Sequence, residues 1–286
     1  MKKILKKYYL ELLFILPLAL YIFGFTLIPI FKTIILSFQD KDTGKYGLEV
    51  YKYLFNRPAF KSAIFNTIAI TCIGLIIQLT AGLSIAMMLK KNFKGKGIVR
   101  SLVLLPMGIP TLVSGVTLIY IFGTQGYINE FFYKIGLMKI PYDWTSGGIK
   151  SLLVIAFGDA WKVTPIVVLL LLAGLESIPN DIYEASGIDG ASWWQTFRYV
   201  TLPLLKPAIT MTVLLRAVDI FRIFELPQIL VGRATPFLAT YAYDEYSYNN
   251  PNASGAASTV LLVLIIIFIG LYLKFIDKGE ALNSGR

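Results

Sequence analysis

Long apolar runs with almost no charge are the feature that most constrains this sequence. A helix needs roughly 20 apolar residues to cross the hydrocarbon core of a bilayer. Six runs reach that length: residues 12–31, 62–89, 101–123, 151–175, 207–231 and 253–273. Hydrophobic residues make up 56% of the chain and charged residues only 15%, a composition unlike that of a water-soluble domain. We therefore predict an all-α integral membrane protein with six transmembrane helices, forming a single transmembrane domain over residues 1–286.

The basic residues predict the side of the membrane on which each loop lies, because cytoplasmic loops are enriched in lysine and arginine. The short segment 90–100 holds five basic residues and no acid, whereas the six basic residues of segment 32–61 share it with three acids. This difference predicts that segment 90–100 and both termini are cytoplasmic. The chain is then a multi-pass protein of a bacterial or archaeal plasma membrane.

The sequence offers little catalytic chemistry. It has no histidine and one cysteine, Cys72, which removes imidazole bases, disulfides and His/Cys metal sites. No Gly-x4-Gly-Lys-Ser/Thr phosphate-binding loop occurs, so we expect any ATP to be hydrolysed elsewhere. The net charge is +10, but the basic residues lie mostly between the apolar runs, which indicates membrane lipid and not nucleic acid as the partner. We predict no catalytic residue, no metal ligand and no bound cofactor.

The predicted cytoplasmic loop 176–206 has the pattern of a helix followed by a turn. Pro179 suits a first helical position, and acids in the opening turns, such as Glu184, are favoured by the helix dipole. We predict that Gly187 ends this helix and that Asp189 caps a second helix beginning at Gly190.

The second helix is predicted to have an apolar side and to stop before the next span. Four large apolar residues recur at helical spacing: Trp193, Trp194, Phe197 and Val200. Pro203 and Pro207 are predicted to end this helix. Two short helices joined by a glycine turn would present a surface to a partner.

The same loop resembles the EAA motif of the membrane subunits of bacterial ABC importers, E-A-A-x3-G-x9-I-x-L-P. The matching residues are Glu184-Ala185-Ser186, Gly190, Val200 and Leu202-Pro203, with Ser186 and Val200 departing mildly from the motif. The stretch from Glu184 to Phe197 resembles the version found in carbohydrate importers, E-A-A-x-I-D-G-A followed by an aromatic residue. Other landmarks of these permeases agree: Asn66-Thr67, Leu104-Leu105-Pro106, Gly126-Tyr127-Ile128-Asn129, Trp161 and Gly255-Ala256-Ala257-Ser258. The turn Val231 to Pro236 differs from the Thr-Gly-Gly-Gly-Pro that is common in the family.

The resemblance implies the ABC type I importer permease fold and membership of the maltose-type first-permease family. It implies four kinds of partner: a second homologous permease, two ATPase subunits that bind ATP and Mg, an extracellular solute-binding protein, and a sugar substrate that crosses by alternating access. It also implies that a set of loop residues contacts an ATPase: Glu184, Ala185, Ser186, Asp189, Gly190, Ala191, Trp194 and Phe197.

Ionisable side chains within two of the apolar runs mark a candidate substrate pathway. They are Asp159 and Lys162 in one run, and Arg216, Asp219, Arg222 and Glu225 in the next. An unpaired charge costs about 2.5–3.5 kcal/mol at the centre of a bilayer, so these groups must pair or face water. Their i,i+3 spacing predicts pairs within the second set and between Asp159 and Lys162.

Some of these groups are expected to bind sugar hydroxyls, since carboxylates accept and guanidinium groups donate hydrogen bonds. The candidate pathway residues are Asp159, Asp219, Phe221, Arg222, Phe224 and Glu225, the two phenylalanines covering an apolar sugar face. Asp219 lies nearest the middle of its run.

Several alternatives remain open at this point. The charges could serve only as ion pairs between packed helices. The solute could be a polyol or a glycerol phosphate. An ion-coupled secondary transporter that uses Asp159 and Asp219 is a further alternative, which inverted repeats would support.

Overall fold

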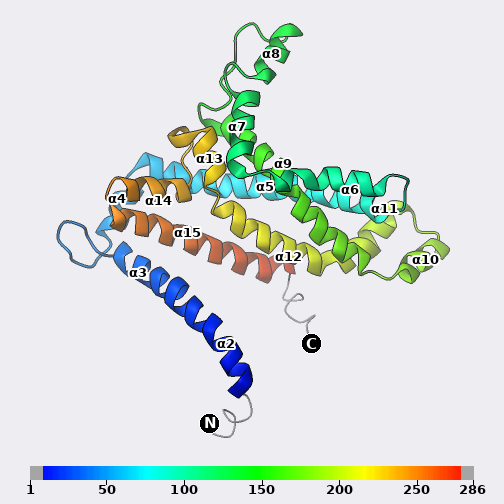
Figure 1. Cartoon of the computed structure of the whole chain (residues 1–286), viewed down its shortest axis with the longest axis horizontal. Coiled ribbons are helices and arrows are strands. Elements are labelled where there is room, and N and C mark those ends of the chain that lie inside the picture. The colour runs from blue at the N-terminus through cyan, green and yellow to red at the C-terminus, as the bar shows by residue number, and fades with distance from the viewer. Residues whose placement is uncertain (1–8, 278–286) are drawn as a thin grey trace.

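The computed structural model describes residues 9–277 (Figure 1). Within this range the chain forms helices joined by turns and loops, with one isolated β-bridge between Gln39 and Tyr46 and no strand. The prediction of an all-helical chain is thus confirmed for the described part. The predicted cytoplasmic placement of the two termini concerns ends that lie outside the described residues.

The helices follow one another along the chain as follows: α2 (Tyr9–Ile22), the π-helical turn η1 (Phe23–Leu27), α3 (Ile28–Ser37), α4 (Glu49–Phe55), α5 (Pro58–Lys90), α6 (Lys96–Leu104), the 3-10 turn η2 (Leu105–Gly108), α7 (Thr111–Phe122), α8 (Tyr127–Lys134), α9 (Gly148–Glu176), α10 (Asn180–Ile188), α11 (Trp193–Thr196), the π-helical turn η3 (Phe197–Thr201), α12 (Leu202–Phe221), α13 (Glu225–Leu230), the 3-10 turn η4 (Gly232–Ala234), α14 (Leu238–Ser247), α15 (Pro251–Tyr272) and the π-helical turn η5 (Leu273–Asp277).

Five helical segments of the described chain are long and apolar enough to cross a membrane: Leu13–Ser37, Pro58–Lys90, Thr111–Lys134, Gly148–Glu176 and Pro251–Asp277. The predicted run 207–231 is not among them, because its helix α12 carries Lys206, Arg216 and Asp219 and ends at Phe221. The structure therefore supports five spans by length and composition, one fewer than the six predicted.

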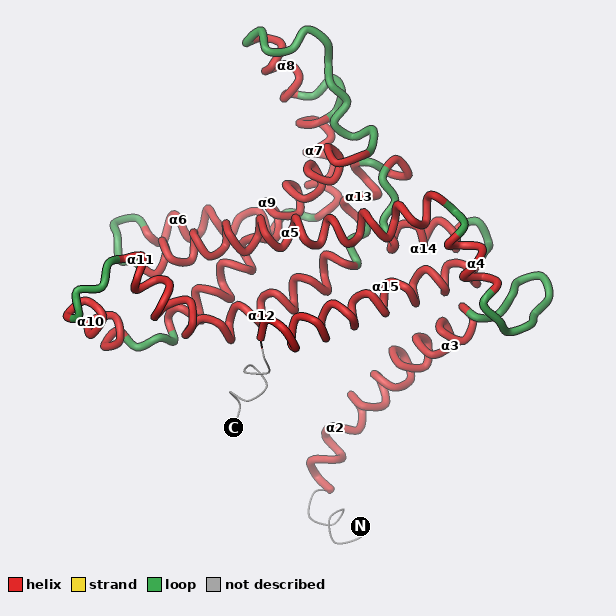
Figure 2. The backbone as a smooth tube through the Cα atoms, turned by 180° about the vertical axis from the view of Figure 1, so that it is seen from behind, coloured by secondary structure: helices red, strands yellow, loops and turns green. Residues whose placement is uncertain are grey.

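Prolines divide the predicted third span. Helix α6 stops at Leu104, and Pro106 and Pro110 lie in the connection to α7. Proline lacks the amide hydrogen that a helix interior needs and restricts the residue before it, so an uninterrupted helix over 101–123 is disfavoured. Helix α6 packs against α9, whereas α7 points away from α6 towards α8 (Figures 1 and 2).

The centre of the fold is a layer of α5, α9 and α12. Helices α5 and α9 run in the same direction, and α12 returns against them. One core cluster, which includes Ile70, Leu118, Ile155 and Ile220, joins α5, α7, α9 and α12. A second cluster, which includes Leu89, Leu172 and Leu205, packs the ends of α5 and α9 against the start of α12.

The N-terminal helices stand apart from this layer. Helices α2 and α3 form an arm that leaves the body beside α4, where α3 meets the start of α15 (Figures 1 and 2). No residue of the apolar window within Leu13–Ser37 is buried inside this chain. The arm therefore presents its apolar side chains to lipid or to another protein.

Three polar residues among the family landmarks form hydrogen bonds that connect loops to helices. The Asn129 amide donates to the carbonyl oxygens of Thr124 and Tyr142 at 2.9 and 2.8 Å, and its oxygen accepts from the Trp144 indole at 3.0 Å. On α5, the Asn66 amide donates to the Pro236 carbonyl, and the Thr67 hydroxyl accepts from the amide of Leu238. These landmark residues thus anchor the segments that follow α8 and α13.

Gly82 sets the distance between α5 and α9. A Cβ atom added there would lie 2.5 Å from Cγ1 of Val167, so only glycine allows this approach. We expect Gly82→Leu to destabilise the fold by at least 1–3 kcal/mol, the usual cost of overpacking. The thermal unfolding midpoint of the full chain in detergent measures this. Gly97→Leu on α6, where an added Cβ meets nothing within 4 Å, is the matched control; equal midpoints for the two variants would contradict the expectation.

Candidate functional site

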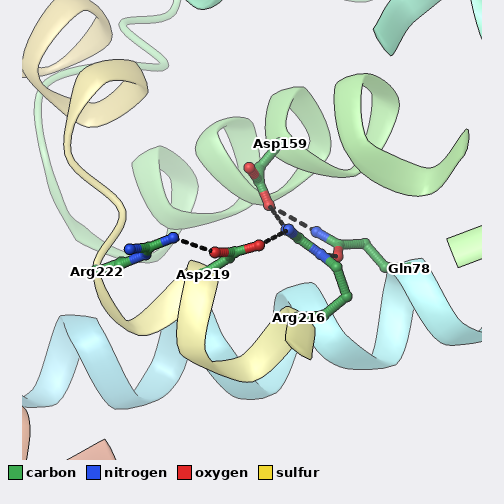
Figure 3. Close-up of polar contacts among 5 residues, drawn as sticks. All are labelled: Gln78, Asp159, Arg216, Asp219 and Arg222. Atoms are coloured by element: carbon green, nitrogen blue, oxygen red, sulfur yellow. Dashed lines mark hydrogen bonds and ion pairs between the residues drawn. The ribbon is translucent and has the colours of Figure 1, made fainter. Parts of the chain in front are cut away.

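Arg216 is the centre of a polar cluster that joins three helices (Figure 3). Its Nε donates to Oε1 of Gln78 at 2.9 Å, its Nη2 lies 3.3 Å from Oδ2 of Asp159, and its Nη1 lies 3.0 Å from Oδ2 of Asp219. The Gln78 amide in turn donates to Oδ2 of Asp159 at 2.7 Å. The Arg216 side chain is 5% exposed. A guanidinium this deep in the fold is stabilised only because two carboxylates and an amide accept its hydrogen bonds.

The cluster continues along α12 towards the surface of the chain. Oδ1 of Asp219 lies 2.7 Å from Nη2 of Arg222, and the exposed fraction of the side chain rises from 34% at Asp219 to 66% at Arg222. Two of the predicted i,i+3 pairs, Arg216 with Asp219 and Asp219 with Arg222, are confirmed. The third, Arg222 with Glu225, is not formed among the described residues, because α12 ends at Phe221 and a new helix begins at Glu225, so the two residues do not share one helix face.

The structure pairs Asp159 with Arg216 and not, as predicted, with Lys162. The Lys162 ammonium donates instead to the hydroxyl of Thr111 at the start of α7. Two oppositely charged residues on one helix can each bind a different partner when a facing helix provides one. Here Arg216 of α12 reaches Asp159 directly.

A cavity of about 420 Å³ opens beside the cluster, between α7, α9 and the break that separates α12 from α13. Its polar lining residues are Thr111, Asp159, Lys162, Asp219, Arg222 and Glu225. The helix stops at Phe221, and residues 222–224 lead irregularly into α13. Irregular backbone at this depth is tolerated where it is buried in protein or lines a polar cavity.

The structure brings five of the six predicted pathway residues to this cavity. Phe224 is half-buried at its wall, with its ring 5.1 Å from that of Tyr243. Phe221 is the exception: it is 4% exposed and packs edge-on against Phe268, with ring centroids 5.4 Å apart. Phe221 lies on the same buried side of α12 as Ala217, one helical turn before it, and is therefore a core residue.

Sequence reasoning missed Gln78 and Thr111. Both are uncharged, and only charged residues were treated as costly inside the apolar runs. An amide also costs free energy in an apolar environment unless it is hydrogen-bonded. The presence of Gln78 within the apolar run 62–89 was therefore a signal that could have indicated a polar partner.

The loop that resembles the EAA motif forms two short helices joined by a tight turn. Helix α10 ends at Ile188, and Gly190 follows with φ +73°, in the left-handed region that favours glycine. The Ala191 amide donates to the Ser186 carbonyl at 3.0 Å, and the Ser186 hydroxyl lies 3.3 Å from that of Thr196. These bonds hold the two helices together as one unit.

The second helix begins three residues later than predicted, at Trp193. Ser192 is its N-cap, in a capping box with Gln195, so Asp189 does not take that role. Neither Pro203 nor Pro207 ends it: α11, η3 and α12 follow without a break, with Pro203 near the start of α12. Proline is tolerated in the first turn of a helix, and the π-helical turn η3 changes the hydrogen-bond register just before it.

The loop residues predicted to contact an ATPase divide by exposure. Five are exposed: Glu184, Ala185, Asp189, Gly190 and Trp194. Ser186, Ala191 and Phe197 are half-buried and hold the turn or pack under it, with the Phe197 ring 5.6 Å from that of Trp194. Ile188 is 86% exposed beside the turn, which extends the apolar surface of the loop.

Solved structures with the same architecture identify the fold. The chain covers 98% of a chain from a bacterial ABC transporter involved in the import of the acidic polysaccharide alginate, with a TM-score of 0.82 and 22% sequence identity over 96% of its own length. The fold is thus that of an ABC importer permease.

Sequence comparison places the chain in a family. Residues 78–280 match the family described as the binding-protein-dependent transport system inner membrane component, and the chain belongs to this family. It is 33% identical over 273 residues to the trehalose/maltose transport system permease protein MalF of Thermococcus litoralis, with 92% of each chain covered. It is also 33% identical over 294 residues to the trehalose transport system permease protein SugA of Mycobacterium tuberculosis, with 97% of this chain and 92% of that one covered.

These findings confirm the resemblance that the EAA-like loop indicated. The chain is a multi-pass membrane permease subunit of an ABC importer. It is not an enzyme, because ATP hydrolysis in such importers belongs to a separate subunit. Among residues 9–277, no three His, Cys, Asp or Glu side chains are grouped to hold a metal ion.

Proposed function

We propose that this chain forms part of the pathway by which an ATP-driven importer carries a sugar across the membrane. The observation that carries the proposal is the polar cavity at the break between α12 and α13, lined by Asp159, Asp219, Arg222 and Glu225. Its volume of about 420 Å³ lies in the range of small-molecule sites. Carboxylates and a guanidinium offer acceptors and donors to hydroxyl groups, and Phe224 offers an apolar face. The relatives of this chain in T. litoralis and M. tuberculosis are named as permeases for trehalose/maltose and for trehalose, which supports a disaccharide as the solute.

The cavity is one half of a pathway in this proposal. A second, homologous permease supplies the other half, and the apolar arm of α2 and α3 offers it a large surface. Alternating access then moves the two permeases against each other around the cavity. The proposal includes a single domain over residues 1–286 that crosses the membrane six times, with α12 as the span that carries the charges and both termini in the cytoplasm.

The pair α10 and α11 is proposed as the contact with one of two ATPase subunits, which bind ATP and Mg. The five exposed residues of the motif and Ile188 form this contact. An extracellular binding protein is proposed to deliver the sugar at the opposite side, where segments 32–61 and 124–148 lie. The family's dependence on a binding protein supports this arrangement and disfavours an ion-coupled transporter.

Reconstitution of the chain with its partner subunits in vesicles tests the proposal. Uptake of trehalose or maltose is expected to require ATP and the binding protein. Glu225→Gln should lower uptake severalfold because it weakens one acceptor in the cavity without changing its shape. Glu176→Gln, at an exposed acid at the end of α9 that lines neither the cavity nor the proposed ATPase contact, is the matched control. Uptake driven by an ion gradient without ATP would contradict the proposal, as would equal rates for the two variants.

A further inference from the structure

A second pocket lies where two spans meet the loop helices. It has a volume of about 300 Å³ and is bounded by the ends of α5 and α9 and by α10 and α11. Lys90 is the last residue of α5, and Leu175 is the last but one of α9. Because α5 and α9 are both long and apolar enough to span the membrane, the pocket lies at the ends of two candidate spans.

Two buried polar atoms at this pocket have no hydrogen-bond partner in the protein. They are Nζ of Lys90 and the phenolic oxygen of Tyr183. Nζ lies 3.7 Å from the centroid of the Tyr183 ring, a cation–π contact that holds the ammonium group but leaves its N–H donors without an acceptor. Buried donors in native proteins are almost always paired, so an acceptor from outside the chain is indicated.

The rest of the pocket wall is mainly apolar. Met87 and Leu175 lie on the side of the spans, and Trp193 and Phe197 stack with their rings nearly parallel, 5.7 Å apart. Charge favours an anion here, because Lys91 also lines the pocket and the rest of segment 90–100 adds three basic residues and no acid. The acids of α10, Asp181 and Glu184, are exposed and are not among the lining residues.

We propose that this pocket binds an anionic phospholipid, with the phosphate accepting hydrogen bonds from Lys90 and Tyr183 and the upper acyl chain against the apolar wall. A free phosphate ion would use only the two donors, whereas a lipid uses the donors and the apolar wall together. Basic pockets at the cytoplasmic ends of membrane helices bind such headgroups. The bound lipid would link the end of α5 to α10, and so hold the loop helices in place. The inference does not depend on the proposed ATPase contact.

Lipid binding to the full chain in mild detergent tests the inference. Phosphatidylglycerol and phosphatidylcholine of equal chain length are titrated separately, and bound lipid is counted by native mass spectrometry. We expect the wild-type chain to bind phosphatidylglycerol about fivefold more tightly, the preference that one basic residue near the membrane surface provides. Lys90→Met should abolish this preference, and Lys90→Arg should retain it. Tyr183→Phe keeps the ring beneath Nζ and removes one donor, so it should lower the preference by a smaller factor.

Lys94→Met is the matched control, since Lys94 is an exposed lysine of the same segment that does not line the pocket. It should leave the preference unchanged. Equal losses in Lys90→Met and Lys94→Met would indicate a diffuse basic surface and overturn the inference. Displacement of phosphatidylglycerol by millimolar inorganic phosphate would overturn it in favour of a free anion. The absence of a preference in the wild-type chain, with loss of ATPase co-purification in Lys90→Met, would assign the pocket to a protein contact.

Discussion

Arg216→Met is expected to leave almost no folded chain in the membrane. Arg216 is the only cation within 4 Å of Asp159 in the described structure, and it also pairs with Asp219. Removing one partner from a buried ion pair costs about 3–5 kcal/mol, because the remaining charge stays buried. Two carboxylates are affected here, and typical net stabilities are only about 5–15 kcal/mol.

The measurement is the amount of monodisperse chain recovered from membranes, followed by its thermal unfolding midpoint. Arg222→Met is the matched control: it removes the same type of side chain at the C-cap of the same helix, but one that is exposed and pairs with Asp219. An exposed ion pair contributes about 0–1 kcal/mol, so this variant should fold almost normally. Similar losses of folded chain in both variants would show that the cost of removing an arginine does not depend on its burial.

A triple variant separates the charge effect from the loss of packing. Asp159→Asn and Asp219→Asn, introduced together with Arg216→Met, remove the stranded charges but keep the side-chain shapes. We expect much of the folded yield to return. Uptake should stay low, because two acceptors of the proposed pathway are gone. No recovery of yield would mean that the Arg216 stem, and not its charge, holds α12 against α5.

Long helices with few charges in their apolar runs could be predicted from the sequence. Run 151–175 lies within α9, which spans Gly148–Glu176, and run 253–273 nearly coincides with α15, which spans Pro251–Tyr272. Local spacing also predicted the two ion pairs along α12. These features depend on residues within one or two turns of each other, so the sequence order alone contains them.

Features that depend on contacts between distant segments could not be predicted. Gln78 is a partner of Arg216 only because α5 lies beside α12, 138 residues away along the chain. Helix α12 ends at Phe221, and no proline or glycine follows directly to predict this end. The continuation of the helix past Pro203 depends on the π-helical turn before it, which no local residue pattern specified.

Gly190→Leu is expected to separate ATP hydrolysis from sugar uptake. The backbone at Gly190 has φ +73°, and an added Cβ meets nothing of this chain within 4 Å. A leucine there would strain the turn by about 1–2 kcal/mol and project outward from the surface proposed to contact an ATPase. Glu184→Lys should act in the same direction by reversing an exposed charge on that surface. We expect each variant to lose at least tenfold in affinity for the ATPase, equivalent to about 1.4 kcal/mol.

Gly136→Leu controls for the strain of the backbone. Gly136 has φ +75° and equally open surroundings, but it follows α8 on the segment proposed to lie outside the cell. ATPase co-purification should therefore be normal in Gly136→Leu and reduced in Gly190→Leu, and ATP hydrolysis stimulated by the binding protein should fall in Gly190→Leu. The choice of sugar should be unchanged in both coupling variants, because the cavity lined by Asp219 is formed by other residues than the turn at Gly190. If Gly190→Leu and Glu184→Lys both retained normal co-purification, hydrolysis and uptake, the exposed turn would have no part in coupling, and the contact with the ATPase would have to lie elsewhere on the same face.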